Sequence, residues 1–459
     1  MRERGAATAI EGEIFHRGEA DYETVRAGMV RNGRKPGRFP EMIVRAASER
    51  DVPAAVRLAR ARGMRVAVRA GGHSWCGSSV RSDGMLIDLS RLRRCRVDPE
   101  RGTATVQPAV TGAALAAELA GHGLAFPTGH CGSVALGGYL LSGGLGWNSG
   151  AVGPACHSVY EVEAVTADGE VVRCDEDENP DLFWAARGAG PGFFAVATAF
   201  RLRPYRLPRA ITSTTYAFPL TDVDEVAEWA TGTAKALPPT VELSLVLATA
   251  DPRMTEAAPR QKVVVVAATA FADTREQAAR SLRPLQDGPL AARALLHEVN
   301  VPTSPRELFE FSGGRWPPQR RYAVDTLWSD ADLGTLLSRL AGAVARAPSG
   351  QSLVLAPLSP VSRDEDLLRD MAFSVLGSSY VVPYAIWDDP AEDGAHTRWL
   401  REAMGTVEPL GTGHYIAEAD LTAASSRAER SFTADDWRRL RALRERYDPQ
   451  GVFHAYPAP

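Results

Sequence analysis

Short hydrophobic runs alternate with amphipathic stretches in the first part of the chain. Residues 42–44 and 65–68 have the composition of strands, and the segment between them begins with the helix-start signals Asp51-Val52-Pro53. We expect Asp51 to cap this helix and Pro53 to lie in its first turn. The pattern predicts a strand, a helix and a second strand.

The same pattern continues to residue 208. Runs 86–89, 104–107 and 160–165 predict strands, and the amphipathic stretch 111–122 predicts a helix that Gly123 ends. Glycine becomes less frequent beyond residues 205–208. We therefore predict a first domain of mixed α+β type over residues 1–208.

The middle of the chain, residues 209–411, has a different order of predicted elements. Strand-like runs at 241–247, 262–267 and 352–356 alternate with helical ones at 222–237, 275–285 and 332–345. This order predicts an antiparallel sheet covered by helices on one side. The last segment, 412–459, contains a predicted helix that starts at Thr433 and ends in a turn at Tyr447-Asp448-Pro449.

Composition narrows the class of protein. The 459 residues are 45% hydrophobic and 24% charged, which is typical of a soluble globular protein of more than one domain. The net charge of -4 provides no basic field for nucleic acid. No apolar leader or membrane-length run is visible, so we expect a cytoplasmic protein without a membrane partner, either a monomer or a homodimer.

The five cysteines predict no disulfide framework, because they are scattered and form no C-x-x-C pair. His73, Cys76, His130, Cys131, Cys156 and His157 offer potential zinc ligands at close spacing. Structural zinc sites need four ligands at paired spacings, and neighbouring residues point in different directions. We therefore expect no metal site.

Two segments are dense in glycine: Arg69-Ala70-Gly71-Gly72-His73-Ser74, directly after a strand, and residues 129–153. Glycine allows backbone amides to approach a ligand closely, as binding of a pyrophosphate requires. The pattern favours a large anionic cofactor, although tight turns and close helix packing are the alternative for any single glycine pair.

Several common enzyme motifs are absent. The run 144–149 lacks the third glycine of the dinucleotide fingerprint, and no phosphate-binding P-loop occurs. No serine occupies a G-x-S-x-G turn. These absences argue against an NAD site of the Rossmann type, an NTPase and a serine hydrolase of the α/β type.

The glycine segments, together with three further motifs, resemble the FAD-linked oxidases of the vanillyl-alcohol oxidase type, and among them the berberine-bridge-enzyme-like group. The motifs occur in the same order over nearly the whole chain. They are Arg69-Ala-Gly-Gly-His73-Ser, Asp88-Leu89-Ser90, Gly129-His-Cys131-Gly-Ser-Val-Ala-Leu-Gly-Gly138, Asn179-Pro-Asp-Leu-Phe-Trp-Ala-Ala-Arg-Gly188 and Tyr447-Asp-Pro-Gln-Gly-Val-Phe453.

This resemblance implies that FAD lies between two α+β subdomains formed by the first part of the chain and the returning C-terminal segment, with the middle as the substrate domain. It also implies bonds from FAD to His73 and to Cys131. Residues expected to contact the cofactor are His73, Cys131, Arg69, Ala70, Gly71, Gly72, Ser74, Ser78, Gly132, Ser133, Leu136, Gly137, Gly138, Gly143, Gly144, Asn148 and Val159.

Removal of hydride from an alcohol or amine carbon needs a base beside the substrate. Similar proteins place a catalytic tyrosine in a Tyr-x-Asn-Tyr-x-Asp motif, whereas this chain has Tyr415-Ile-Ala-Glu418-Ala-Asp420. Glu418 is therefore the expected base or anchor for a cationic amine, with an exposed strand glutamate as the alternative. Tyr139 and Tyr415 are the further catalytic candidates, and the Tyr139 hydroxyl is expected to reach the flavin.

The resemblance implies an FAD-dependent oxidase that acts on a small organic molecule, in secondary metabolism, with dioxygen as acceptor. Two alternatives remain open. A flavin dehydrogenase would pass the electrons to another acceptor, and a non-redox flavoprotein would use FAD to shape a binding or cyclisation pocket. The missing catalytic tyrosine keeps the second alternative open.

Overall fold

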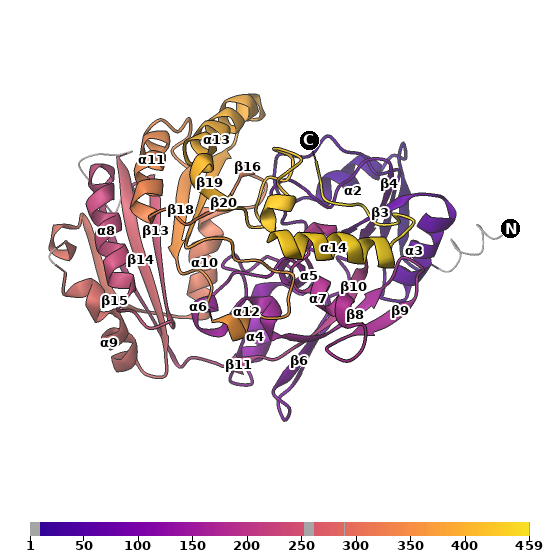
Figure 1. The fold of residues 1–459 in the computed structure, drawn as a ribbon, viewed down its shortest axis with the longest axis horizontal. Helices are drawn as coiled ribbons and strands as arrows, with labels where there is room; N and C mark the ends of the chain where they lie inside the picture. Colours follow the sequence, from indigo (N-terminus) through magenta and orange to yellow (C-terminus); the bar gives the residue numbers. More distant parts are fainter. Residues whose placement is uncertain (1–9, 252–260, 289, 363, 459) are drawn as a thin grey trace.

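The computed structural model describes residues 10–251, 261–288, 290–362 and 364–458. Figure 1 shows a part that carries the glycine segments on one side and a large sheet covered by helices on the other. The mixed α+β fold with an antiparallel sheet is thereby confirmed.

A four-stranded sheet contains the first strands, in the order β1-β2-β4-β3. Strands β2, β4 and β3 are parallel, and α3 connects β2 to β3. Every residue of β4 is buried, as expected of a central parallel strand. The bounds are β1 (Glu13–His16), α2 (Tyr22–Gly28), β2 (Met42–Arg45), α3 (Asp51–Ala61), β3 (Arg65–Arg69) and β4 (Gly84–Asp88).

The start of α3 differs from the expectation. No side chain caps this helix, and the Asp51 carboxylate accepts hydrogen bonds from the amides of Glu11, Gly12 and Ala47 at 2.8, 3.0 and 2.7 Å. A buried carboxylate needs donors, and these three amides supply them. The prediction that Asp51 caps the helix is therefore wrong, whereas Pro53 does lie in the first turn.

A five-stranded antiparallel sheet follows, in the order β5-β6-β10-β8-β9, beside the strand pair β7 and β11. The Thr111 side chain accepts from the Ala114 amide at 3.3 Å and caps α4. The bounds are β5 (Cys95–Asp98), β6 (Thr103–Val106), α4 (Gly112–Ala120), β7 (Leu124–Ala125), α5 (Leu136–Leu141), α6 (Ser149–Val152), β8 (Val159–Val165), β9 (Val171–Cys174), α7 (Pro180–Ala186), β10 (Val196–Leu202) and β11 (Tyr205–Arg206).

The large sheet has nine strands, and all its pairs are antiparallel. Its order is β15-β12-β14-β13-β18-β19-β17-β20, with β16 also paired to β19. The bounds are β12 (Ala210–Pro219), β13 (Val241–Thr249), β14 (Lys262–Ala272), β15 (Leu296–Thr303), β16 (Arg321–Val324), β17 (Leu327–Ser329), β18 (Leu353–Leu358), β19 (Ser379–Trp387) and β20 (Gly411–Gly413).

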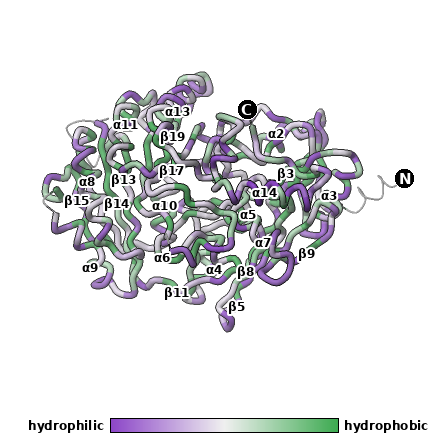
Figure 2. The backbone as a smooth tube through the Cα atoms, viewed as in Figure 1, coloured by the Kyte–Doolittle hydropathy of each residue, from purple (hydrophilic) through white to green (hydrophobic). Residues whose placement is uncertain are grey.

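Alternation along the strands separates the two faces of this sheet. On β13, Leu243, Leu245 and Leu247 point to the core beneath the helices, while Glu242 and Ser244 face the other way. Figure 2 shows the apolar character of these strands. The helices that cover the core face are α8 (Val223–Ala234), α9 (Arg275–Gln286), α11 (Leu333–Ala345) and α13 (Asp393–Val407). The helices α10 (Pro305–Arg315) and α12 (Glu365–Leu368) do not contribute to this core.

The C-terminal segment returns to the first part of the chain. Helix α14 (Ala434–Tyr447) packs against α7. The segment that follows α14 pairs with strand β3. The Val66 amide donates to Val452 at 2.6 Å, and the His454 amide donates to Val66 at 2.9 Å. Among the described helices, none combines the length and apolarity that crossing a bilayer would require.

Candidate active site

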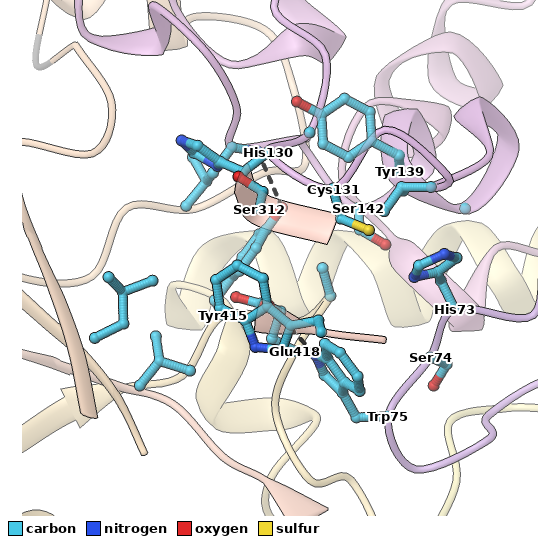
Figure 3. Close-up of a pocket in the computed structure, with 18 of the residues that line it drawn as sticks. His73, Ser74, Trp75, His130, Cys131, Tyr139, Ser142, Ser312, Tyr415 and Glu418 are labelled. Atoms are coloured by element: carbon cyan, nitrogen blue, oxygen red, sulfur yellow. Dashed lines mark hydrogen bonds between the residues drawn. The ribbon is translucent and has the colours of Figure 1, made fainter. Parts of the chain in front are cut away.

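A cavity of about 1220 Å³ lies between the glycine segments and the open face of the nine-stranded sheet. Ligand sites for one small molecule usually measure about 300–1,000 Å³. The volume therefore has room for a cofactor and a substrate together. Figure 3 shows side chains from the first glycine segment, the second glycine segment and the C-terminal segment around this space.

The first glycine segment leaves β3 and runs along the cavity wall. Among the described residues, no acceptor is bonded to the amides of Gly71, Gly72, His73 and Ser74. Gly72 has a φ of +72°, and a Cβ there would lie 2.2 Å from the Met29 carbonyl oxygen, so glycine is required. The segment thus offers consecutive free donors to an anion.

His73 and Cys131, the two tether residues that are expected to form bonds to FAD, both contact the Ser133 hydroxyl. The Ser133 oxygen lies 2.9 Å from His73 Nε2 and 3.3 Å from Cys131 Sγ. Burial, and then the guanidinium groups of Arg31 and Arg69, lower the pKa of His73 to about 3. The imidazole is therefore neutral at pH 7, with a nitrogen lone pair available for bonding.

The second glycine segment reaches the cavity through α5. Gly137 and Gly138 line the space, and the Gly137 amide donates to Pro108 at 2.8 Å. A Cβ on Gly138 would meet nothing within 4 Å, so this glycine keeps part of the cavity open. Expected contact residues that also line the cavity are Arg69, Ala70, Gly71, Gly72, His73, Ser74, Ser78 and Cys131.

Other expected cofactor contacts do not line the cavity, namely Gly132, Ser133, Leu136, Gly143, Gly144, Asn148 and Val159. Gly143 and Gly144 have positive φ and pack against Phe373 and Tyr139. The Asn148 side chain is buried, and the backbone N–H of Asn148 donates to the Glu242 carboxylate at 2.6 Å. Glycine density in this segment thus serves backbone packing as well as the cavity.

Glu418 stands on a turn beyond β20 and not on a strand. Its carboxylate accepts hydrogen bonds from Trp75 Nε1 at 3.3 Å, from the Tyr384 hydroxyl at 3.0 Å and from the Tyr380 hydroxyl at 3.2 Å. Burial, and then the charge of Glu418, raise the pKa values of both tyrosines, so both are neutral donors. The structure thus places a half-buried, fixed carboxylate in the cavity (Figure 3).

The two tyrosine candidates have different partners. The Tyr139 hydroxyl donates to the Pro127 carbonyl at 2.6 Å and points away from His73 in Figure 3. The hydroxyl proton is thus used within the protein, and a hydrogen bond from the flavin to this hydroxyl stays a prediction. The Tyr415 hydroxyl accepts from the amides of Gly144 and Leu145 at 3.1 and 3.3 Å. Both phenols therefore support the second glycine segment.

A second carboxylate lies on the sheet side of the cavity. His130 Nε2 is 3.2 Å from one Glu242 oxygen, and the other oxygen accepts from the Asn148 amide at 2.6 Å. The His130 ring packs edge-on against Trp147, with centroids 4.3 Å apart. Sequence reasoning considered His130 only as a zinc ligand and missed Glu242.

Two further features were missed or only partly foreseen. Tyr380 and Tyr384 stand four residues apart on β19, and this spacing places both hydroxyls on one face of the strand. Trp75, two residues beyond His73, carried no signal of a link to Glu418. Within the described part of the chain, no group of three or more His, Cys, Asp or Glu side chains is placed to hold a metal ion.

The residues present fit FAD. Free amides at Gly71–Ser74 suit the pyrophosphate, the open space beside Gly138 accommodates a large ligand, and a neutral His73 lies near Cys131. Bound there, FAD would supply a hydride acceptor.

Comparison with known proteins identifies the family. Residues 40–175 match the model of the FAD binding domain. The FAD-linked oxidoreductase ptmO of Penicillium ochrochloron is 33% identical over 435 residues, covering 93% of this chain and 92% of that protein. The (R)-6-hydroxynicotine oxidase of Paenarthrobacter nicotinovorans is 34% identical over 201 residues, 44% of this chain and 43% of that protein.

The fold agrees with this assignment. The structure of berberine bridge enzyme from Eschscholzia californica superimposes with a TM-score of 0.82 at 19% identity, covering 98% of this chain and 97% of that one. The protein therefore belongs to the FAD-linked oxidoreductases, and it shares the fold of berberine bridge enzyme.

Proposed function

We propose that this oxidoreductase is an oxidase, which removes a hydride from an alcohol or amine carbon of a small organic molecule and passes the electrons to dioxygen. The observation that carries the proposal is Glu418, a carboxylate fixed by Trp75, Tyr380 and Tyr384 inside the cavity. Such a group either receives the substrate proton or holds a cationic amine. Bound FAD supplies the hydride acceptor.

Dioxygen is the proposed acceptor because the sequence carries neither an NAD fingerprint nor cysteine spacing for an iron–sulfur cluster. The relative that oxidises 6-hydroxynicotine is named an oxidase, which supports the same class of reaction here. A flavin dehydrogenase would have the same residues around the substrate and would differ in its acceptor.

We further propose that FAD is attached through both His73 and Cys131. The shared contact of the two side chains with Ser133 supports this, because it brings an imidazole and a thiol to the same stretch of cavity wall. Two bonds would hold the cofactor without bulky clamping residues, which suits an open substrate site. The role of the surrounding protein is then to orient the substrate and to handle its proton.

Anaerobic mixing tests the proposed reaction. The holoenzyme is mixed with a panel of amines and alcohols, and bleaching of the flavin absorbance is followed before air is admitted. We expect at least one compound to bleach the flavin, and air to restore the colour with release of hydrogen peroxide. Restoration by an artificial dye but not by air would instead assign a dehydrogenase, and product formation without any bleaching would assign a non-redox flavoprotein.

A further inference from the structure

The cavity contains a second acid–base pair, His130 and Glu242, which the role of Glu418 does not use. Both oxygens of Glu242 are engaged, one with His130 Nε2 and the other with the Asn148 amide. Glu242 therefore favours the tautomer that carries its proton on Nε2. This leaves Nδ1 as the nitrogen that takes up or releases a proton.

The Nδ1 atom of His130 has no bonded partner among the described residues, and the ring is nearly half exposed to the cavity, with 45% of the side chain accessible. The Glu418 carboxylate differs, because three protein donors already bind it. The lone pair on His130 Nδ1 is unoccupied, so this nitrogen meets the requirement for a general base.

The charges around His130 strengthen it as a base. Burial alone would lower its pKa, but the carboxylates of Glu242 and Glu418 outweigh burial and raise the pKa. Glu242 faces the ring from β13, Glu418 faces it from the C-terminal segment, and the Cys131 thiol follows it in the chain. A histidine held by a carboxylate in this way accepts a proton more readily than a free imidazole does.

We propose that His130, supported by Glu242, accepts the proton of a substrate hydroxyl, while Glu418 binds a cationic nitrogen of the same molecule. The substrate class is then a hydroxylated amine. This inference rests on the proposed function and deepens it, because it assigns the base to His130 and the binding of the cation to Glu418.

The proton balance is simple. The O–H bond of the substrate breaks, and a bond from His130 Nδ1 to that hydrogen forms. The proton on Nε2 stays on the nitrogen and remains hydrogen-bonded to Glu242. The negative charges of Glu242 and Glu418 stabilise the positive imidazolium that results. When the carbon that bears the hydroxyl also gives up its hydride to FAD, the alcohol becomes a carbonyl.

The test uses 4-nitrophenol, a small hydroxyl probe whose ionised form absorbs visible light. Holoenzyme is titrated with it at several pH values below the solution pKa of the probe, and the nitrophenolate band is recorded against probe-free holoenzyme. The variants are His130→Gln, Glu242→Gln and the control Ser244→Ala. Ser244 is two residues from Glu242 on the same face of β13.

We expect the ionised fraction of bound probe to exceed that of free probe by about tenfold in the wild-type protein and in Ser244→Ala. In His130→Gln it falls to the value of the free probe. Glu242→Gln retains an oxygen for the Asn148 amide and removes the charge, so ionisation falls there while the fold is kept. Equal ionisation in all four proteins, or no bound probe in the wild type, overturns the proposal.

A second measurement does not depend on the probe. In holoenzyme with 13C-labelled histidine, the ring signal that His130→Gln removes should titrate above the pKa of a free imidazole, and Glu242→Gln should lower that pKa. A titration that Glu242→Gln leaves unchanged contradicts the pair. Both tests are equilibrium measurements, so failure of every amine and alcohol to bleach the flavin refutes the oxidase alone, and unchanged variants refute the His130 pair alone.

Discussion

Trp75 donates a hydrogen bond from its indole nitrogen to the Glu418 carboxylate at 3.3 Å, although the two residues are 343 positions apart in the chain. Trp75 follows the tether candidate His73 by two residues, and its ring meets Tyr384 edge-on at 5.8 Å. The contact therefore connects the residue that follows the first glycine segment with Glu418, which also accepts from the two tyrosines of β19. These four side chains form one hydrogen-bonded unit in the cavity wall.

The Glu418→Gln substitution keeps the shape of the side chain and removes its charge. For any amine that bleaches the flavin, we expect the rate of anaerobic reduction at limiting substrate to fall by about 10²-fold or more, because the substrate loses its anchor or its base. Stopped-flow absorbance measures this, and its substrate dependence separates binding from chemistry. Wild-type behaviour of the variant with every amine would make Glu418 a bystander.

Gly72→Ala should damage the cofactor loop. A Cβ would lie 2.2 Å from the Met29 carbonyl oxygen at a backbone φ of +72°, so we expect a loss of at least about 2 kcal/mol of stability and poorer FAD incorporation. Thermal unfolding and the flavin-to-protein absorbance ratio measure the two effects. Gly28→Ala is the matched control, since its Cβ meets nothing within 4 Å. Equal stability and equal FAD incorporation in the two variants would contradict the role of the Gly72 loop in cofactor binding.

The large sheet was predictable because its strands carry strong local patterns. Alternation on β13 and the apolar run of β14 indicate strands whatever they pair with. The capping role of Asp51 was predicted wrongly, since its true partners, such as Glu11 and Gly12, lie about 40 positions earlier in the chain. Local signals identify an element, but they do not identify a distant donor.

The candidate site was predictable only where a motif carried it. His73, Cys131 and Glu418 stand in recognisable segments, and all three line the cavity. Trp75 and Glu242 also line the cavity, but no motif identifies them, because each acquires its role from a partner on another segment. Such contacts depend on how the sheets pack, which periodicity along one chain does not specify.

Acid should weaken the contact between the end of α13 and the C-terminal segment. Burial would raise the pKa of Glu408, but His414, Arg427 and Arg430 outweigh it and lower that pKa to about 2. Because the folded pKa is lowered from 4.5, the ionised group stabilises the fold above about pH 4.5, by roughly 1–2 kcal/mol after solvent screening, and this is lost as the pH falls toward 2.

Urea unfolding of the wild type and of Glu408→Gln measures this contribution at a series of pH values. We expect the gap between their unfolding free energies to be widest above about pH 4.5 and to close by about pH 2. A gap that stays constant over this range would show that the ionisation of Glu408 does not stabilise the fold.

The two tether residues should act independently. His73→Ala should leave Cys131 as the single attachment, and Cys131→Ser should leave His73, so each variant keeps covalent flavin and loses thermal stability. The double variant should lose its colour on acid precipitation. Ser133→Ala is a useful comparison, because it removes the shared hydroxyl contact and leaves both tethers. Colour that survives acid in the double variant would contradict both assignments.

The proposed covalent attachment of FAD is tested by the intact mass of the denatured protein. After acid precipitation and washing, mass spectrometry of the 49.3 kDa chain should show the polypeptide plus one FAD, in a yellow pellet. The mass of the bare polypeptide, with the yellow colour left in the supernatant, would contradict the claim.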